Sequence, residues 1–249
     1  MRSSLLAPLV ALAAIASLTG CAAAPEREPA ADRVRDVAAR VPASGASTPP
    51  APQADPEAGQ RLEPTGPATS DGTPRAATLS VPDLGLQDFP VQAYRGTTDD
   101  VAGTVIQDAG DVASPYGPDG GVGPGGVGNY LVTGHRLSST EPFLELPSLE
   151  RGDRVTVTAD GTDYVYEVRT TRETSFREPA SLAAQRAAVP GRPGAEPTRA
   201  MITLSTCATP EDHAEGNYWS DENGNPEHRI DKIGVLVDVR QVEASSAGS

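Results

Sequence analysis

The chain has 249 residues and a formal net charge of −14, but its residues are distributed unevenly. All ten aromatic residues lie between Phe89 and Trp219, so the first third has too few bulky side chains to build a core. Residues 78–249 carry 26 acidic and 13 basic residues, and such a surface repels phosphate backbones, which excludes nucleic acid as a partner. The composition therefore predicts one folded domain preceded by a tail.

The first 21 residues have the layout of a secretory signal peptide. Arg2 precedes a mostly apolar run over residues 5–18, which is too short for a membrane-spanning helix. The following Leu-Thr-Gly-Cys at residues 18–21 resembles the lipobox of bacterial lipoproteins. This resemblance implies a lipid on the sulfur of Cys21 and a location at the extracellular face of the cell membrane. The alternative is a signal that is uncleaved or cleaved without lipid.

Residues 22–76 are predicted to form a disordered spacer. Residues 22–75 include ten prolines and thirteen alanines, and most of the others are small or charged. A segment of this composition has too little apolar surface to offset the entropy of ordering. The spacer would hold the domain away from the membrane.

Residues 77–249 are predicted to be the folded domain. Glycine, proline and aspartate separate short β-branched or alternating segments, which predict strands at residues 78–81, 89–93, 129–133, 154–159, 163–170, 200–206 and 233–239. Asp160 and Gly161 predict a tight hairpin, residues 178–189 a helix, and residues 142–149 a helical turn. Many strands and few helices indicate a mainly β domain, either a closed barrel or a sandwich.

Two polar or glycine-rich regions are expected to carry no chemistry. The glycines of residues 117–128 are followed by neither a helical pattern nor Lys-Ser/Thr, so they predict a flexible loop and no phosphate site. Asp99 and Asp100 are expected on a solvated surface.

A histidine and a cysteine each follow the end of a predicted strand. The strand over residues 129–133 leads into Gly134-His135, and the strand over residues 200–206 leads into Cys207. If these strand ends meet on one face, Cys207 is a nucleophile and His135 its proton carrier for acyl transfer. A buried, unreactive Cys207 is the alternative.

The same segments resemble those of a known family. Thr-Leu-Ser-Thr-Cys at residues 203–207 resembles the Thr-Leu-x-Thr-Cys signature of sortases, the cysteine transpeptidases of bacterial surfaces. Gly-His-Arg at residues 134–136 resembles their histidine segment, and its form is similar to that of class E enzymes of high-GC Gram-positive bacteria. The resemblance spans residues 78–239. It implies a closed, eight-stranded β-barrel with one or two short helices and no cofactor.

The resemblance also implies a reaction and its partners. Cys207 would attack the threonine carbonyl of a Leu-Pro-x-Thr-Gly or Leu-Ala-x-Thr-Gly sorting signal on a secreted protein, forming a thioester. His135 would protonate the departing glycine amine and then deprotonate an acceptor amine on a peptidoglycan precursor or a pilin. Hydrolysis of the thioester is the expected side reaction.

The family's third catalytic residue is an arginine at the start of the last strand. Arg229 is the predicted residue, because a guanidinium can donate several hydrogen bonds at once. Lys232 is the alternative, because it directly precedes the apolar run and the segment after Cys207 is longer than expected. Thr133 and Thr206 are expected to line the substrate groove, because each lies next to a catalytic segment.

The segment over residues 208–228 contains further polar and aromatic residues. His213 and His228, with nearby acids, raise the question of a metal site, but their spacing matches no common pattern, and no metal is expected. Tyr218 and Trp219 are expected to pack as a lid over the groove or onto the barrel.

Two other functions remain open from the sequence. One is a non-catalytic, lipid-anchored β-domain that binds cell-wall or peptide ligands, with Cys207 as a packing residue. The other is a general cysteine hydrolase. Only a transpeptidase would form a new peptide bond when it is given an amine.

Overall fold

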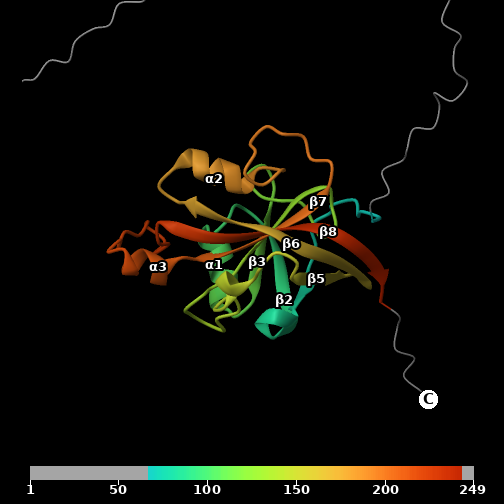
Figure 1. The fold of residues 1–249 in the computed structure, drawn as a ribbon, viewed down its shortest axis with the longest axis horizontal. Coiled ribbons are helices and arrows are strands. Elements are labelled where there is room, and N and C mark those ends of the chain that lie inside the picture. Colours follow the sequence, from blue (N-terminus) through green and yellow to red (C-terminus); the bar gives the residue numbers. More distant parts are fainter. Residues whose placement is uncertain (1–66, 243–249) are drawn as a thin grey trace, which may run out of the picture. The chain divides into compact units, whose positions relative to one another are not determined.

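The computed structural model describes residues 67–242, and their central feature is a closed barrel of eight strands (Figure 1). The strands are β1 (Ala77–Val81), β2 (Leu86–Arg95), β3 (Val112–Tyr116), β4 (Gly128–Thr133), β5 (Arg154–Ala159), β6 (Thr162–Ser175), β7 (Ala200–Cys207) and β8 (His228–Gln241). Their order around the barrel is β1-β2-β3-β4-β7-β8-β6-β5, and β5 pairs with β1 to close it. The predicted mainly β, closed eight-stranded barrel is confirmed.

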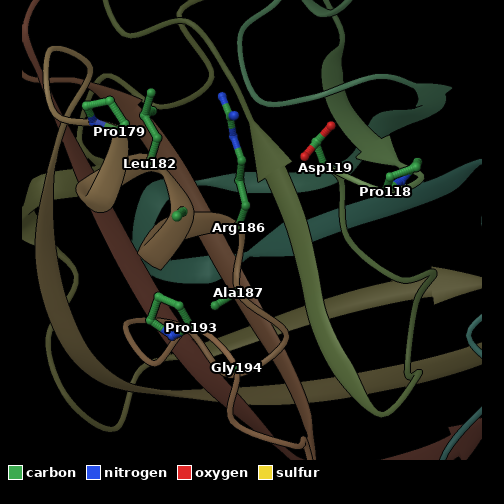
Figure 2. Close-up of a pocket in the computed structure, with 9 residues that line it drawn as sticks. Pro118, Asp119, Pro179, Leu182, Arg186, Ala187, Pro193 and Gly194 are labelled. Atoms are coloured by element: carbon green, nitrogen blue, oxygen red, sulfur yellow. The ribbon is translucent and has the colours of Figure 1, made fainter.

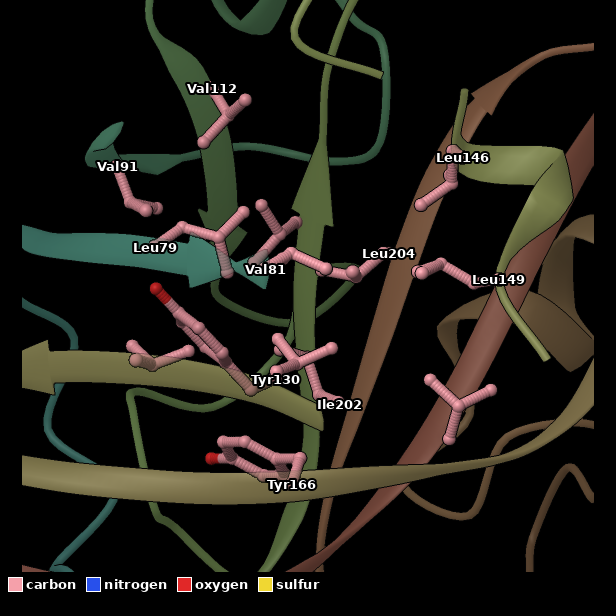
Figure 3. Close-up of a cluster of buried hydrophobic side chains, with 14 of the residues drawn as sticks. Leu79, Val81, Val91, Val112, Tyr130, Leu146, Leu149, Tyr166, Ile202 and Leu204 are labelled. Atoms are coloured by element: carbon pink, nitrogen blue, oxygen red, sulfur yellow. The ribbon is translucent and has the colours of Figure 1, made fainter. Parts of the chain in front are cut away.

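Apolar side chains from all eight strands meet in the barrel interior (Figure 3). The alternation of side chains along β7 explains how one strand serves two environments. Ile202 and Leu204 point into the apolar core, while Thr203 and Ser205 lie on the opposite face of the strand. The polar face of β7 is also buried, so a second, polar layer is packed against the outside of this part of the barrel.

The hairpin between β5 and β6 forms where it was predicted. Ala159 pairs with Thr162, and the two residues between them, Asp160 and Gly161, have φ angles of +48° and +71°. Two consecutive positive φ angles are typical of the type I′ turn, which Asp-Gly favours.

Three α-helices and two 3₁₀ turns accompany the strands in the described part of the chain. They are α1 (Val101–Asp108), α2 (Pro179–Arg186), α3 (Thr209–Ala214), η1 (Pro82–Leu84) and η2 (Leu146–Ser148). Helix α2 and turn η2 lie within the predicted helical segments. Helices α1 and α3 were not predicted, because both are short and α1 contains Gly103, a poor helix former. Gly103 is needed there, because a Cβ atom would collide with the Tyr94 ring.

Strand β3 was also missed, and β8 begins five residues earlier than predicted. Pro115 lies within β3 and argues against a strand in a sequence pattern. Residues 228–232 are mostly charged and lay outside the predicted strand, but β8 pairs with β6 from His228 onward and with β7 from Arg229 onward. Tertiary pairing therefore overrides local preference at both places.

The end of the predicted spacer contacts the glycine-rich segment. The Ser70 amide donates to the Gly125 carbonyl at 2.9 Å, and the Gly123 amide donates to the Gly72 carbonyl at 2.8 Å. Residues 67–76 thus contact the domain, and residues 117–127, part of the segment predicted as a flexible loop, form turns with isolated bridges before β4 begins at Gly128. The signal peptide, Cys21 and spacer residues 22–66 lie outside the described residues.

No helix within residues 67–242 is long and apolar enough to cross a membrane.

Candidate active site

Cys207 and Arg229 face each other across two neighbouring strands. The antiparallel register of β7 and β8 pairs the two residues directly, and Nη1 of Arg229 donates a hydrogen bond to the Cys207 sulfur at 2.6 Å. Arg229 is only 1% exposed, while the Cys207 side chain is partly accessible. The structure therefore places a buried cation against the sulfur of a partly exposed cysteine.

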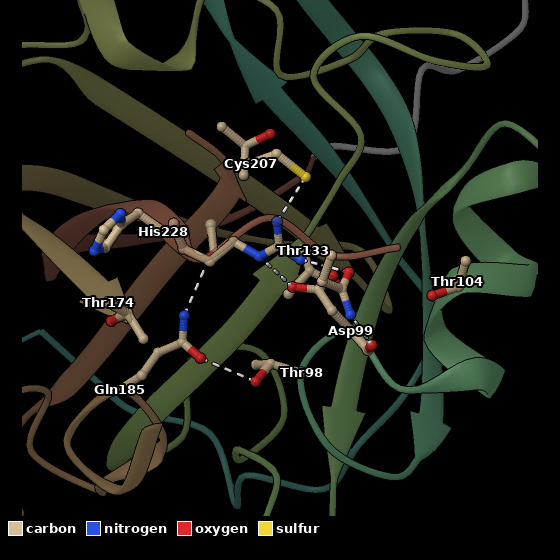
Figure 4. A network of polar contacts seen from close by, with 12 residues as sticks. Thr98, Asp99, Thr104, Thr133, Thr174, Gln185, Cys207 and His228 are labelled. Atoms are coloured by element: carbon tan, nitrogen blue, oxygen red, sulfur yellow. Dashed lines mark hydrogen bonds and ion pairs between the residues drawn. The ribbon is translucent and has the colours of Figure 1, made fainter. Parts of the chain in front are cut away.

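The other two nitrogens of the Arg229 guanidinium also have partners, one of which is Asp99, labelled in Figure 4. Nε donates to Oδ2 of Asp99 at 3.0 Å, and Nη2 donates to Oδ1 of Asn225 at 2.6 Å. The Phe176 ring lies against the guanidinium, with its centroid 4.5 Å from Cζ. Each nitrogen thus has a different partner, which fixes the orientation of the group.

Lys232 lies on the other face of β8 and contacts neither Cys207 nor Asp99. Its Nζ donates to the carbonyls of Pro147 and Leu149 at 2.8 and 2.7 Å, and to Oγ1 of Thr171 at 2.9 Å. Lys232 therefore binds the segment around η2, and of the two candidate cations only Arg229 reaches the sulfur.

His135 is brought close to Cys207 by the parallel pairing of β4 and β7. Thr133 pairs with Ser205, so both strands end at the same edge of the barrel. His135, Cys207 and Arg229 line one cavity of about 230 Å³. Nε2 of His135 lies 2.8 Å from Oδ1 of Asp108, at the end of α1. The two motifs therefore meet, as the acyl-transfer hypothesis requires.

Arg136, the last residue of the Gly-His-Arg segment, binds the backbone at Cys207. Its Nη1 donates to the Cys207 carbonyl at 3.3 Å and also forms an ion pair with Glu211. This contact ties the segment after β4 to the start of α3.

Thr133 and Thr206 lie behind the cavity instead of lining it. Thr133 is fully buried, and its hydroxyl accepts a hydrogen bond from Gln107 at 3.3 Å. Thr206 donates to the Gly134 carbonyl at 2.8 Å. The expectation that both line the groove rested on adjacency in sequence, but successive strand residues point to opposite faces, so a neighbour of Cys207 points away from it.

Two charged neighbours act on the Cys207 thiol in opposite directions. Burial raises the pKa of Cys207, the positive charge of Arg229 opposes that change, and the negative charge of Asp99 adds to it. The pKa therefore lies above the usual value, and the resting site favours the neutral thiol. The Arg229 pKa is raised as well, because Asp99 and Cys207 outweigh the cost of burying the guanidinium.

A buried polar layer packs α2 against the outside of the barrel, next to Cys207 and Arg229 (Figure 4). Gln185 of α2 donates to Ser205 at 3.2 Å and to Asp231 at 2.9 Å, and it accepts from Thr98 at 2.9 Å. Thr174 donates to the other oxygen of Asp231 at 2.6 Å. Burial raises the Asp231 pKa, although these hydrogen bonds oppose the change. This layer holds the strand positions that adjoin Cys207 and Arg229.

Asp99 and Asn225 are functional candidates that the sequence reading missed. Asp99 was expected on a solvated surface but is 7% exposed, because Arg229 and Gln107 enclose its carboxylate. Asn225 lies in the loop between α3 and β8. Its side-chain amide donates to the carbonyl of Asp99, which is distant in sequence, and to the carboxylate of Asp221 in the same loop. No local pattern marks either residue.

The aromatic residues Tyr218 and Trp219, and His213, make contacts outside the cavity that holds Cys207. Tyr218 is exposed and stacks on His213, while the Arg177 guanidinium lies 5.6 Å from the Trp219 ring centroid. Neither aromatic side chain lines the cavity that holds Cys207. Within residues 67–242, no group of three or more His, Cys, Asp or Glu side chains could hold a metal ion.

A second, larger cavity of about 360 Å³ lies between α2 and the loop that follows β3 (Figure 2). Arg186 and Asp119 are its charged residues, and its other walls are mostly proline, leucine and alanine. It contains no nucleophile and no proton carrier of the cysteine–histidine type. The candidate chemistry therefore belongs to the smaller cavity.

Comparison with known proteins identifies the family. The sortase domain model matches residues 79–219. The SrtA sortase from Actinomyces oris is 21% identical, with a TM-score of 0.51 over 73% of this chain and 89% of that chain. Sortase E1 from Streptomyces coelicolor, solved with a tripeptide in the active site, is 24% identical, with a TM-score of 0.50 over 70% and 94% of the two chains. Both structures share the barrel fold. No curated protein sequence matches. Because the domain model covers more than half of the chain, this protein belongs to the sortase family, whose members are generally cysteine transpeptidases.

Proposed function

We propose that this sortase cleaves a Leu-Pro-x-Thr-Gly or Leu-Ala-x-Thr-Gly sorting signal between threonine and glycine and transfers the new acyl group to an amine. The observation that carries the proposal is the hydrogen bond from Arg229 to the Cys207 sulfur, in a cavity that His135 also lines. A nucleophile, a proton carrier and a fixed cation are the groups that thiol-based acyl transfer needs.

The chemistry needs two acyl transfers and no cofactor. His135 first takes the proton of the Cys207 thiol. The thiolate then attacks the threonine carbonyl, and the guanidinium of Arg229 stabilises the negative oxygen of the tetrahedral intermediate. The carbon–nitrogen bond then breaks, His135 donates a proton to the departing glycine amine, and a thioester remains on Cys207. An acceptor amine attacks the thioester, His135 takes its proton, and the thiolate leaves. Water in place of the amine gives hydrolysis as the side reaction.

We further propose class E as the subclass and a cationic amine as the acceptor. The Gly-His-Arg form of residues 134–136 supports the subclass. Residues 78–249 contain 13 more acidic than basic residues, which favours the approach of an ammonium group over that of an anion. A peptidoglycan precursor or a pilin lysine carries such an amine.

We place the enzyme at the extracellular face of the cell membrane, with a lipid on Cys21. The lipobox-like residues 18–21 and the proline-rich residues that follow support this placement. Expression with a radiolabelled fatty acid should label the parent chain but not the Cys21→Ser variant. Equal labelling of the two chains would contradict the anchor.

The full chain, incubated with a Leu-Ala-x-Thr-Gly or Leu-Pro-x-Thr-Gly peptide and triglycine, tests the reaction. Mass spectrometry should show cleavage at Thr-Gly, an acyl adduct on Cys207, and a product extended by triglycine. Cys207→Ala should abolish all three, and His135→Gln should slow turnover by about 10²–10⁴-fold. Peptide binding without cleavage would favour the non-catalytic binding domain, and cleavage without the extended product would favour a hydrolase.

A further inference from the structure

Asp99 is the buried acid next to the proposed catalytic residues. It lies between β2 and α1 with a φ angle of +54°, in the left-handed region that Asp and Asn tolerate better than most residues. Oδ2 accepts from Nε of Arg229 at 3.0 Å, and Oδ1 accepts from Gln107 at 3.0 Å. The Asp99 carbonyl accepts from Asn225 at 3.1 Å. Side chains from α1, β8 and the loop before β8 therefore fix this residue.

These contacts determine where the Arg229 guanidinium points. The group is planar and rigid, so holding Nε on Asp99 and Nη2 on Asn225 leaves Nη1 directed at the Cys207 sulfur. Of these partners, Asp99 alone supplies a negative charge in direct contact with the guanidinium. A buried guanidinium without an acid beside it is strongly unfavourable.

We propose that Asp99 is a positioning residue for acyl transfer: it holds the Arg229 guanidinium against the Cys207 sulfur and supplies its counter-charge. This inference rests on the proposed function of Arg229 and Cys207. Asp99 touches neither the sulfur nor the substrate in this role and acts through the arginine.

The charged groups around the Cys207 sulfur make the role of Asp99 measurable through the pKa of the thiol. Arg229 is the cation in contact with Cys207, Asp99 lies behind it, His135 lines the same cavity, and Arg136 binds the Cys207 carbonyl. The Asp99 charge contributes to the raised pKa of the thiol. Removing only the Asp99 charge should therefore affect the thiol and the turnover differently from removing both the charge and the hydrogen-bond acceptor for Arg229.

Two substitutions at one position separate these effects. Asp99→Asn removes the charge but keeps an acceptor for Nε and tolerates the left-handed backbone, whereas Asp99→Ala removes both the charge and the acceptor. Asp238→Asn, near the far end of β8, where the side chain is 43% exposed, is the control for the same charge change. All variants are made in the full chain with Cys21→Ser, so that Cys207 is the single thiol.

The measurements are the pH midpoint of Cys207 alkylation by iodoacetamide, kcat and KM for peptide cleavage, and the thermal unfolding midpoint. Asp99→Asn should lower the alkylation midpoint and raise the alkylation rate at pH 7 about threefold or more, since less negative charge opposes the thiolate. Asp99→Ala should lower kcat about tenfold or more, as expected for loss of a charged hydrogen bond, while KM changes less than about threefold. Asp99→Asn should retain more kcat than Asp99→Ala.

Two results would overturn the proposal. One is an alkylation midpoint and kcat in both Asp99 variants that equal those of the Asp238→Asn control. The other is lower thermal stability with an unchanged midpoint and kcat, which would make Asp99 structural only. If Asp99→Ala does not fold, the midpoint of Asp99→Asn still decides. Alkylation needs no peptide, so if every peptide failed to react, the proposed function would be refuted while the alkylation midpoint would still test whether Asp99 acts on Cys207 through Arg229.

Discussion

Arg229 and Lys232 are both buried cations on β8, yet their surroundings differ completely. Arg229 contacts the Asp99 carboxylate and the Cys207 sulfur, whereas Lys232 contacts only two carbonyls and a hydroxyl. Because side chains alternate along a strand, a separation of three residues places the two on opposite faces. A buried cation paired with an acid and a nucleophile is suited to catalysis, and one that caps carbonyls is suited to stability.

The strongest test of this contrast is Arg229→Lys. An ammonium group on a flexible stem cannot contact Asp99, Asn225 and the Cys207 sulfur together in the geometry of a planar guanidinium. We expect kcat/KM for the sorting peptide to fall about 10²-fold or more, measured by release of the glycine fragment. Activity within about threefold of the parent would show that charge alone suffices at this position.

Lys232→Met should affect stability and leave catalysis unchanged. The substitution removes the donor that the Pro147 and Leu149 carbonyls share, and we expect the free energy of unfolding to fall by about 1–3 kcal/mol in urea titrations. The turnover of each folded molecule, counted by titration of Cys207, should match that of the parent. A loss of turnover at unchanged stability would reverse the roles of the two cations.

Asp108→Asn extends the comparison from the buried Asp99–Arg229 pair to the more exposed Asp108–His135 pair. Asp108 contacts His135 at 2.8 Å, but its side chain is 65% exposed, so water screens its charge far more than that of Asp99. We expect kcat at neutral pH to fall less than about fivefold, a smaller change than for Asp99→Ala. A larger loss than that of Asp99→Ala would make Asp108 the more important of the two acids.

His228, next to Arg229 on β8, should affect only the pH dependence of stability. Burial disfavours its charged ring, but the hydrogen bond and charge of Asp212 outweigh burial and raise the pKa of His228 above its usual 6.5. A raised pKa in the folded state contributes stability that is full below pH 6.5 and disappears as the pH rises through the folded-state pKa.

Urea unfolding of the parent and His228→Gln chains at several pH values measures this effect. The difference in free energy of unfolding should be largest in acid and should shrink toward alkaline pH. A difference that grows with pH would contradict the assigned direction. Glu173→Gln serves as a control, because Glu173 lies 3.9 Å from the His228 ring and is mostly exposed.

Local sequence was sufficient for much of the fold and for two of the proposed catalytic residues. Asp160 and Gly161 predicted their turn because the backbone requirement of a two-residue hairpin is local. Cys207 and His135 were recognisable because short segments around them resemble those of a family. Strand β3 was not predictable, because Pro115 argues against a strand that only its neighbours stabilise.

The choice between Arg229 and Lys232, and the burial of Asp99, depended on tertiary structure. The sequence pattern began the last strand at residue 233, so it did not assign Arg229 and Lys232 to faces of a strand. Pairing with β6 and β7 extends β8 back to His228, and the alternation of side chains then places the two cations on opposite faces. Asp99 and Arg229 are 130 residues apart in the chain. The sequence by itself indicated the family and the proposed nucleophile, because those signals are contiguous, whereas the environment of Cys207 comes from strand register and long-range contacts that only folding creates.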